Sequence, residues 1–301
     1  MGGIVGYSIQ CCRSMKIKRI ISGILVSSMA FSIIGCSSKN AKVEFAPEVG
    51  SKYVCTMTDK TDFVVDREKV YSEVSTLSTN IDMKSKTEDG YVIGFSIKDF
   101  SRDLEQKDKK KGEGSIKRSD SKYRKIYDEL DKLNIEYEVG NDGKVVAADL
   151  GGVDENIKAL FGQDMLLQFL DVSMGTFAGT TFSEGGLAVY RNILGDGYLL
   201  KDLVQVDILQ EQESDIKLSD IGAKIIIEDI TDSFILVKLV GNKKIINTTY
   251  DLDMSYLVDR NSGIITKSEC RLNIDNIKWQ ASNTNDRGEF TFVETSEWKE
   301  Q

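Results

Sequence analysis

The sequence predicts an α+β fold: a large antiparallel sheet covered by two or so amphipathic helices. Three observations predict it. Roughly eight to eleven segments alternate apolar and polar residues, which is typical of strands with one buried face. Short turn sequences such as ITDS and DRNSG join neighbouring segments, and strands joined by short turns are antiparallel. Two further segments carry apolar residues at helical spacing and could cover the buried face.

The first predicted strands lie between residues 51 and 100. Residues 51–65 alternate as a strand. Residues 68–86 and 91–100 alternate in the same way, and the sequence TEDG between them favours a turn. These two segments therefore predict a hairpin. Residues 102–118 are charged and have no apolar period, so they predict a solvated loop, with a basic docking patch as the alternative.

Two segments predict the helices. Residues 119–134 carry apolar side chains at helical spacing, and Ser119 or Ser121 would serve as the N-cap. Residues 153–172 carry a broad apolar stripe, and Asp154 lies favourably in the first turn. Each helix would lay its apolar stripe on the sheet.

The remaining segments extend the sheet. Residues 135–150 predict a hairpin with its turn at GNDG. Residues 175–197 are rich in glycine and predict a loop with short strands; they lack the lysine-serine ending of a phosphate-binding loop. From residue 201 onward nearly every segment reads as strand, and 249–274 form the clearest hairpin, with its turn at 261–263.

The N-terminus reads as an export signal. Lys16, Lys18 and Arg19 form a basic region, and an apolar run follows from Ile20 to Phe31. That run is shorter than the ~20 residues that a membrane-spanning helix needs. The segment is therefore interpreted as a signal peptide.

A short motif ends this signal. The residues Ile33, Ile34, Gly35 and Cys36 resemble the lipobox of bacterial lipoproteins. The resemblance implies cleavage after Gly35, thioether lipidation of Cys36 and acylation of the new amino terminus, for example by palmitate. Two or three acyl chains would give stable membrane anchoring. The alternatives are an ordinary signal peptide or a buried thiol.

These features divide the chain into four parts. Residues 1–14 are interpreted as an upstream extension before a start at Met15, and 15–35 as the lipoprotein signal peptide. Residues 36–50 form a lipidated tether with a reach of about 40 Å. Residues 51–301 form a single extracytoplasmic domain.

Charge and composition exclude several classes of function. The chain has 39 Lys+Arg and 48 Asp+Glu, and four basic residues leave with the signal, so 35 positive charges face 48 negative ones. This acidic balance argues against nucleic acid as a partner. The chain has no histidine, which excludes histidine-based triads and histidine metal sites. No cofactor is expected, and carboxylates alone would have to carry any catalysis.

Two cysteines of the domain, Cys55 and Cys270, lie in strand-like segments. An exported protein could join them in one disulfide. They could equally be two buried free thiols, and the sequence does not decide between these readings.

Three short motifs carry a further resemblance. They are GSKY at residues 50–53, GKV at 143–145 and the hairpin turn from Asp259 to Ile265. With the mid-chain helix, they resemble uncharacterised bacterial lipoproteins whose architecture is similar to the half-barrel of lipoprotein-localisation carriers and related mycobacterial lipid-binding lipoproteins. The resemblance implies a curved antiparallel sheet wrapped around helices, and it transfers no functional residue.

Two functional hypotheses follow. The first is a lipoprotein with a structural or interaction role in the cell envelope, without catalysis, whose partner is another envelope protein. The alternative is a carrier that holds a lipid or other apolar ligand between sheet and helices, lined by Tyr53, Met57, Phe95, Tyr256 and Leu272. In both, Cys36 anchors the chain outside the cytoplasm to a bacterial membrane, which would be the outer membrane if the cell has two.

Overall fold

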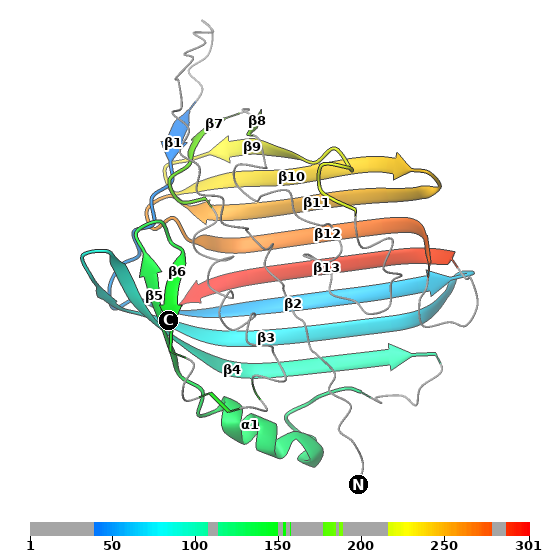
Figure 1. Ribbon diagram of the computed structural model, residues 1–301, viewed down its shortest axis with the longest axis horizontal. Coiled ribbons are helices and arrows are strands. Elements are labelled where there is room, and N and C mark those ends of the chain that lie inside the picture. Colours follow the sequence, from blue (N-terminus) through cyan, green and yellow to red (C-terminus); the bar gives the residue numbers. More distant parts are fainter. Residues whose placement is uncertain are drawn as a thin grey trace, which may run out of the picture.

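The computed structural model describes residues 39–107, 114–149, 153–154, 157, 177–184, 187–188, 216–278 and 287–301. These residues form one 11-stranded antiparallel sheet in the order β6-β5-β4-β3-β2-β13-β12-β11-β10-β9-β8, and β1 and β7 form a separate two-stranded ribbon. Figure 1 shows the long strands lying side by side across the molecule.

The strands vary widely in length, and those at the middle of the sheet are the longest. Their bounds are β1 Asn40–Lys42, β2 Lys52–Val65, β3 Glu68–Lys86, β4 Gly90–Gln106, β5 Ile135–Gly140, β6 Val145–Ala148, β7 Thr181–Ser183, β8 Leu187–Ala188, β9 Lys224–Ile230, β10 Phe234–Ile245, β11 Thr248–Asp259, β12 Ile265–Lys278 and β13 Arg287–Glu300.

The last strand joins the two halves of the sheet. β13 pairs with β2 on one side and with β12 on the other. Strands β2 to β6 and strands β8 to β12 therefore belong to one continuous ladder of main-chain hydrogen bonds. The short predicted turns are confirmed, and the pairs that they join are antiparallel, as is the pair of β13 with β2, which no turn joins.

One face of the sheet, here called the inner face, carries the hydrophobic core. Alternate residues of each strand point to it, as the period of two requires. They form two clusters. The β9–β12 cluster includes Val237, Leu252 and Leu272, and the β3–β5 cluster includes Leu77, Ile93 and other buried residues. Burying each such side chain stabilises the fold by about 1.5–3 kcal/mol.

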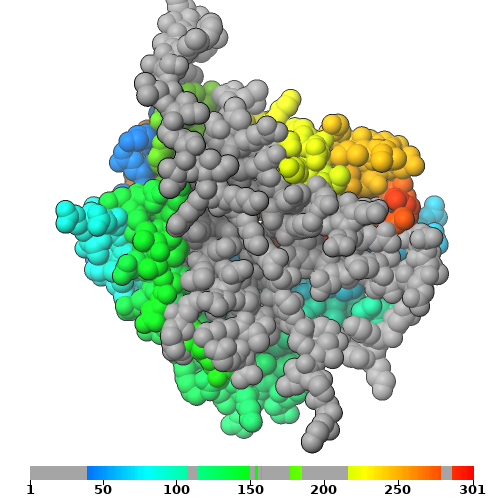
Figure 2. Space-filling view, viewed as in Figure 1, coloured from blue at the N-terminus to red at the C-terminus, as the bar shows by residue number. Residues whose placement is uncertain are grey.

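The two ends of the strands are different surfaces. One end of the sheet, here called the near end, contains the β3–β4 and β11–β12 turns and is crossed by residues 44–51. There, Ala46 N–H donates to the Ser262 carbonyl in the β11–β12 turn, and Gly50 N–H donates to the Met83 carbonyl of β3. The β5–β6 turn joins this end, because Asn141 N–H donates to the Asp89 carbonyl. Figure 2 shows the green surface of β5 and β6 beside the cyan surface of the β3–β4 hairpin. At the far end lie the β2–β3 and β10–β11 turns and the adjoining ends of β12 and β13.

The segment predicted as part of a tether is folded. Residues 40–47 alternate between exposed and buried, and Ala41, Val43 and Phe45 are almost fully buried. β1 pairs with β7 through three residue pairs. The structure therefore differs from the predicted tether of 36–50, because alternate apolar side chains give this polar segment one face that packs.

The segment predicted as a loop begins as strand. β4 continues to Gln106, and Arg102 exchanges two main-chain hydrogen bonds with Ile116. Further along the same edge, the hydroxyl of Tyr127 donates to the Phe100 carbonyl over 2.5 Å. These contacts occupy edge groups of β4 that would otherwise be open to pairing with another chain.

The predicted α+β class, with two or so covering helices, is wrong. Among the described residues, the one α-helix with defined bounds is a seven-residue segment, α1 Arg124–Leu130, preceded by a 3₁₀ turn at Ser121–Tyr123; Ile157 is also helical, but its neighbours lie outside the described residues. The 3₁₀ turn is capped by Asp120, whose carboxylate accepts from Lys122 N–H, and not by Ser119 or Ser121, and the N-cap position of α1 is Tyr123, which makes no side-chain cap hydrogen bond. The described structure is mostly strand, and β1 and the end of β4 add to the strands that the sequence predicts, whereas β7 and β8 lie in 175–197, which it predicts as a loop with short strands.

Part of the prediction cannot be compared with the structure. The second predicted helix, 153–172, lies outside the described residues except for three of its positions, of which Val153 and Ile157 are buried. The predicted strand at 201–209 lies outside them entirely. The antiparallel sheet itself is confirmed.

Candidate functional site

A belt of polar side chains crosses the inner face between the two hydrophobic clusters. On each of four neighbouring strands, the side chains on one side of the belt belong to the β3–β5 cluster and those on the other side to the β9–β12 cluster. On β2, for example, Met57 belongs to the first and Phe63 to the second. The central belt consists of Asp59, Glu73, Ser75, Arg102 and Glu294.

The register aligns this belt across the sheet. Arg102 lies opposite Ser75, and Ser75 lies opposite Asp59. Asp59 in turn lies opposite Glu294, so two carboxylates are direct cross-strand neighbours on the inner face. Like charges in this position destabilise a strand pair. The sheet therefore places charge at a level where the sequence pattern calls for apolar side chains.

Glu73 is the centre of a hydrogen-bonded group within the belt. Its carboxylate accepts from Arg102 Nη2 over 2.7 Å, from Ser75 Oγ over 3.1 Å and from the hydroxyl of Tyr71. The side chains of Arg102 and Glu73 are only 13% and 20% exposed, so solvent screens this ion pair weakly.

Burial and charge act in opposite directions on these groups. Burial alone would lower the pKa of Arg102, but the Glu73 carboxylate beside it outweighs burial, and the pKa is raised. Burial, followed by the charge of Glu73, raises the pKa of Tyr71. Both groups therefore keep their protons at neutral pH, and Arg102 stays charged beside Glu73.

The two thiols near the belt are protonated and unreactive. Burial raises the pKa of Cys55 to about 12, with a smaller contribution from the charge of Glu294. Burial also raises the pKa of Cys270 well above its ordinary value, with Glu294 and Asp59 adding to the effect. Because the thiolate is the nucleophile, these cysteines lack the environment of a reactive thiol.

The register also separates the two cysteines. Cys270 lies opposite Glu294, which pairs with Asp59, four residues along β2 from Cys55. An offset of two strands and four residues is about 16 Å, whereas a disulfide needs Cα atoms within about 7 Å. Both cysteines are free and buried, so of the two readings that the sequence allowed, the structure has the pair of buried thiols.

The five predicted ligand-lining residues do not form one site. Met57 and Phe95 belong to the β3–β5 cluster, and Tyr53 packs against it. Tyr256 and Leu272 belong to the β9–β12 cluster, on the other side of the belt. All but Tyr53 are buried, with at most 8% exposed.

The predicted cleavage and lipidation residues, Gly35 and Cys36, lie outside the described residues. Within the described residues, no helix combines the length and apolar character needed to cross a membrane. The same part of the chain contains no group of three or more acidic or cysteine side chains arranged to hold a metal ion.

Sequence reasoning missed the belt, although a signal was present. Asp59 has the same strand parity as Cys55 and Met57, and Glu73 has that of Leu77. A charged residue on the apolar parity of a strand is the mark of a buried polar group. Arg102 could not be found this way, because its segment lacks an apolar period.

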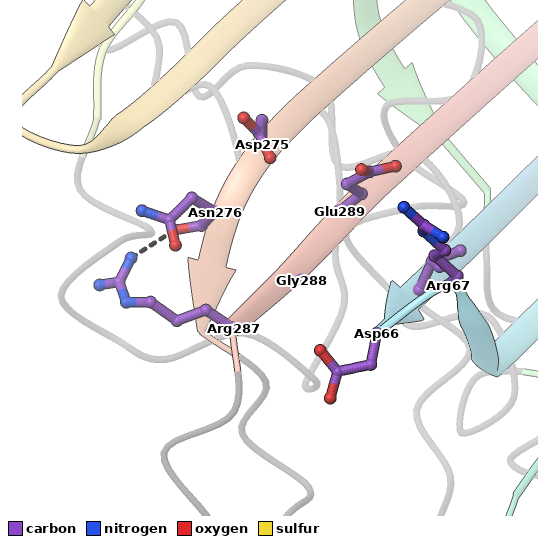
Figure 3. A pocket seen from close by; sticks show the side chains of 8 residues that line it. Asp66, Arg67, Asp275, Asn276, Arg287, Gly288 and Glu289 are labelled. Carbon is purple, nitrogen blue, oxygen red and sulfur yellow. Dashed lines mark hydrogen bonds between the residues drawn. The ribbon is translucent and has the colours of Figure 1, made fainter.

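A pocket at the far end is the second candidate site. It has a volume of about 290 Å³ and lies where the β2–β3 turn meets the ends of β12 and β13 (Figure 3). Charged side chains of both signs line it. This far-end pocket is defined by Asp66, Arg67, Asp275, Asn276, Arg287 and Glu289.

Comparisons with known proteins leave the family open, since no protein-family model and no curated protein matches the chain. Among solved structures, one of lipovitellin, concerned with its lipid–protein interactions, matches with a TM-score of 0.41 and 11% identity. The match covers 84% of this chain and 25% of lipovitellin, so this chain spans about a quarter of that protein's length.

Two further structures match with lower scores. An exported protein of Bacteroides fragilis with a YmcC-like fold has a TM-score of 0.17 and 11% identity, covering 84% of this chain and 98% of that one. DynF from the dynemicin biosynthesis pathway of Micromonospora chersina has a TM-score of 0.18 and 7% identity, covering 95% and 96%. At such scores these similarities carry no inference about function.

Proposed function

We propose that this chain is a lipid-anchored protein on the outer side of a bacterial membrane, with a structural or interaction role in the cell envelope and no catalysis. The anchor rests on the residues from Ile33 to Cys36, which match a lipobox behind a basic and apolar signal. The proposed role rests on the difference between the two faces of the sheet, of which one is buried and the other is polar.

One observation carries the proposed role: the inner face is already buried. The side chains of both clusters have at most 8% of their surface exposed, including four of the five that a bound apolar ligand would contact. What remains for recognition is the polar outer face and the two strand ends. These surfaces suit contacts with another protein.

The anchor is tested by following a labelled fatty acid in growing bacteria that express the full chain. Wild-type protein should carry the label and sediment with membranes. Cys36→Ala should lose both properties, whereas Cys12→Ala, in the upstream extension, should keep them. Label that persists on the Cys36→Ala chain would refute the anchor.

The interaction role is tested by placing a photoreactive residue at Thr56 or Lys60, two exposed positions on the outer face of β2. Irradiation of intact cells should yield a discrete cross-linked product from at least one of them. A chain that forms no product at either position, at normal expression, would contradict an outer-face partner.

The central belt favours a second candidate, a carrier for an amphipathic ligand. A belt with the Glu73–Arg102 ion pair between two apolar clusters offers both kinds of contact that such a ligand needs. Protein purified from native membranes should then release one lipid per chain on extraction with organic solvent, as seen by mass spectrometry. An extract without stoichiometric lipid would exclude the carrier.

A further inference from the structure

The far-end pocket collects opposite charges from one turn and two strands. Asp66 and Arg67 form the two-residue β2–β3 turn, Asp275 and Asn276 lie near the end of β12, and Glu289 lies near the start of β13. Figure 3 shows Arg67 beside Glu289 on one side of Gly288, and Asn276 with Arg287 on the other. The turn lies more than 200 positions from the two strands in the chain, so the pocket exists only in the folded sheet.

The charges that line the pocket do not neutralise one another. Arg67 forms no ion pair with Asp66, Asp275 or Glu289, and within the described residues these four side chains have no hydrogen-bond partner. Arg287, by contrast, donates to the Asn276 carbonyl. Opposite charges that face one pocket without touching leave a gap that a ligand with both charges could bridge.

The backbone around the pocket is held in an uncommon conformation. Asp66, Arg67 and Asn276 have φ values of 50°, 67° and 63°, in the left-handed region that glycine normally occupies. Hydrogen bonds hold Asn276 in place: its side chain donates to the Asn247 carbonyl, and its own carbonyl accepts from Thr248. Asn276 is therefore held firmly in its left-handed conformation.

The size of the pocket limits what it can take. A volume of about 290 Å³ is at the lower end of the range for small-molecule sites, which is roughly 300–1,000 Å³. An extended polymer would not fit within it. A guanidinium pairs with a carboxylate through two parallel hydrogen bonds, and a carboxylate pairs with an ammonium group.

We propose that the far-end pocket binds a small zwitterion that carries one ammonium and one carboxylate group, of the class of amino acids and short peptides. Arg67 receives the carboxylate of the ligand, and Glu289 receives its ammonium group. Asp275, on the neighbouring strand, adds a second carboxylate for that cation. Binding of this kind goes beyond a structural role in the envelope and does not depend on the lipid anchor.

Three dipeptides test the proposal against the full chain in detergent micelles. Alanyl-alanine has both charges, its N-acetyl form lacks the ammonium group, and its C-terminal amide lacks the carboxylate. Isothermal titration calorimetry should show binding of the free dipeptide in the millimolar range. Each blocked form should bind about fivefold more weakly or worse, because each loses one charged contact.

Two variants assign the contacts. Glu289→Gln should reduce the preference for the free form over the N-acetyl form, with Asp275 retaining the remainder, and Arg67→Gly should bind the free and amide forms alike. Glycine at position 67 suits the left-handed backbone, so this variant keeps the turn. Asp232→Asn, which alters a fully exposed acid in the β9–β10 turn at the near end, is the matched control and should behave as wild type.

The location of the bound dipeptide is determined separately by NMR, with the backbone amides of the arginines labelled. The signals of Arg67 and Arg287 should shift with the free dipeptide, while those of Arg118 and Arg260 should not. The proposal is overturned if the free dipeptide does not bind, if the blocked forms bind equally well, or if both variants match wild type. Shifts confined to arginines outside the pocket would overturn it as well.

Discussion

Both ends of the sheet need backbone positions in the left-handed conformation, but the near end and the far end place different residues there. At the near end, the left-handed positions are glycines: Gly50 before β2, Gly143 in the β5–β6 turn and Gly263 in the β11–β12 turn. At the far end they carry side chains. These far-end residues are Asp66, Arg67, Ile246 and Asn276, which are all the non-glycine residues with positive φ among those described.

This difference indicates that the near end serves stability and the far end serves recognition. Glycine adopts a left-handed conformation without steric cost, whereas other residues lose roughly 1–2 kcal/mol there. The near end therefore minimises strain where residues 44–51 pack. The far end accepts strain, and strain of this kind is found where a side chain has a use. Three of the four far-end residues line the pocket, and the fourth, Ile246, is 89% exposed beside it.

The largest effect is expected from Gly263→Ala at the near end. A Cβ at this position would overlap the carbonyl oxygen of Glu44, and φ is 72°, so both sterics and conformation oppose the change. We expect a loss of about 2–4 kcal/mol in the free energy of unfolding, measured by urea denaturation.

Gly222→Ala is the matched control for that change. Its φ is 67°, but a Cβ there would meet nothing within 4 Å. It should cost only the conformational term of about 1–2 kcal/mol. Equal losses in the two variants would show that the packing of residues 44–51 on the β11–β12 turn adds nothing to stability.

Alkaline pH should lower the free energy of unfolding through a buried thiol in the core, which belongs to neither end of the sheet. The pKa of Cys55 is raised from an ordinary value of 9.0 to about 12 in the folded chain, so the unfolded thiol loses its proton first as pH rises. Stability that is fully present below pH 9 should therefore fall by up to about 1.4 kcal/mol per pH unit as pH approaches 12.

Urea unfolding at pH 9 and pH 10 measures this slope. Cys55→Ala should start from a lower stability, because it leaves a small cavity, and should show a shallower slope. The comparison stops at pH 10 because the buried tyrosines, including Tyr71, begin to contribute above that pH. A slope unchanged in Cys55→Ala would contradict the burial of a neutral thiol.

A smaller effect of opposite sign is expected at the far end. Ile246 is β-branched and has a φ of 56°, which is unfavourable for such a side chain. Ile246→Gly should raise the free energy of unfolding by about 0.5–1 kcal/mol, because it relieves the strain and loses only exposed surface. Ile235→Gly, in the same strand pair but fully buried, should be strongly destabilising. A loss of stability in Ile246→Gly would mean that this turn is not strained.

The sequence predicts the sheet well for a physical reason. Alternation reports which side chain of a strand is buried, and turns such as TEDG report where the chain reverses, so β2 to β5 and β9 to β13 are found from local pattern. The class was wrong because helical spacing at 119–134 fits a 3₁₀ turn followed by two helical turns as well as it fits a longer helix. Residues 40–47 were missed because alternation in a short polar segment is weak.

The candidate sites were harder to predict, since both are built from pairings that are distant in the chain. The central belt forms only when β13 lies beside β2 and brings Glu294 opposite Asp59. The far-end pocket needs the same pairing to place Glu289 near Arg67. Register between strands more than 200 residues apart depends on the whole sheet, and no local pattern reports it.

The contrast between the two ends is tested most directly by Arg67→Gly, with stability and binding measured on the same protein. The account predicts a free energy of unfolding raised by about 0.5–1 kcal/mol, together with loss of the preference for alanyl-alanine over its amide. A variant that is destabilised, or that keeps wild-type discrimination between the two dipeptides, would contradict the claim that the far end accepts strain for recognition.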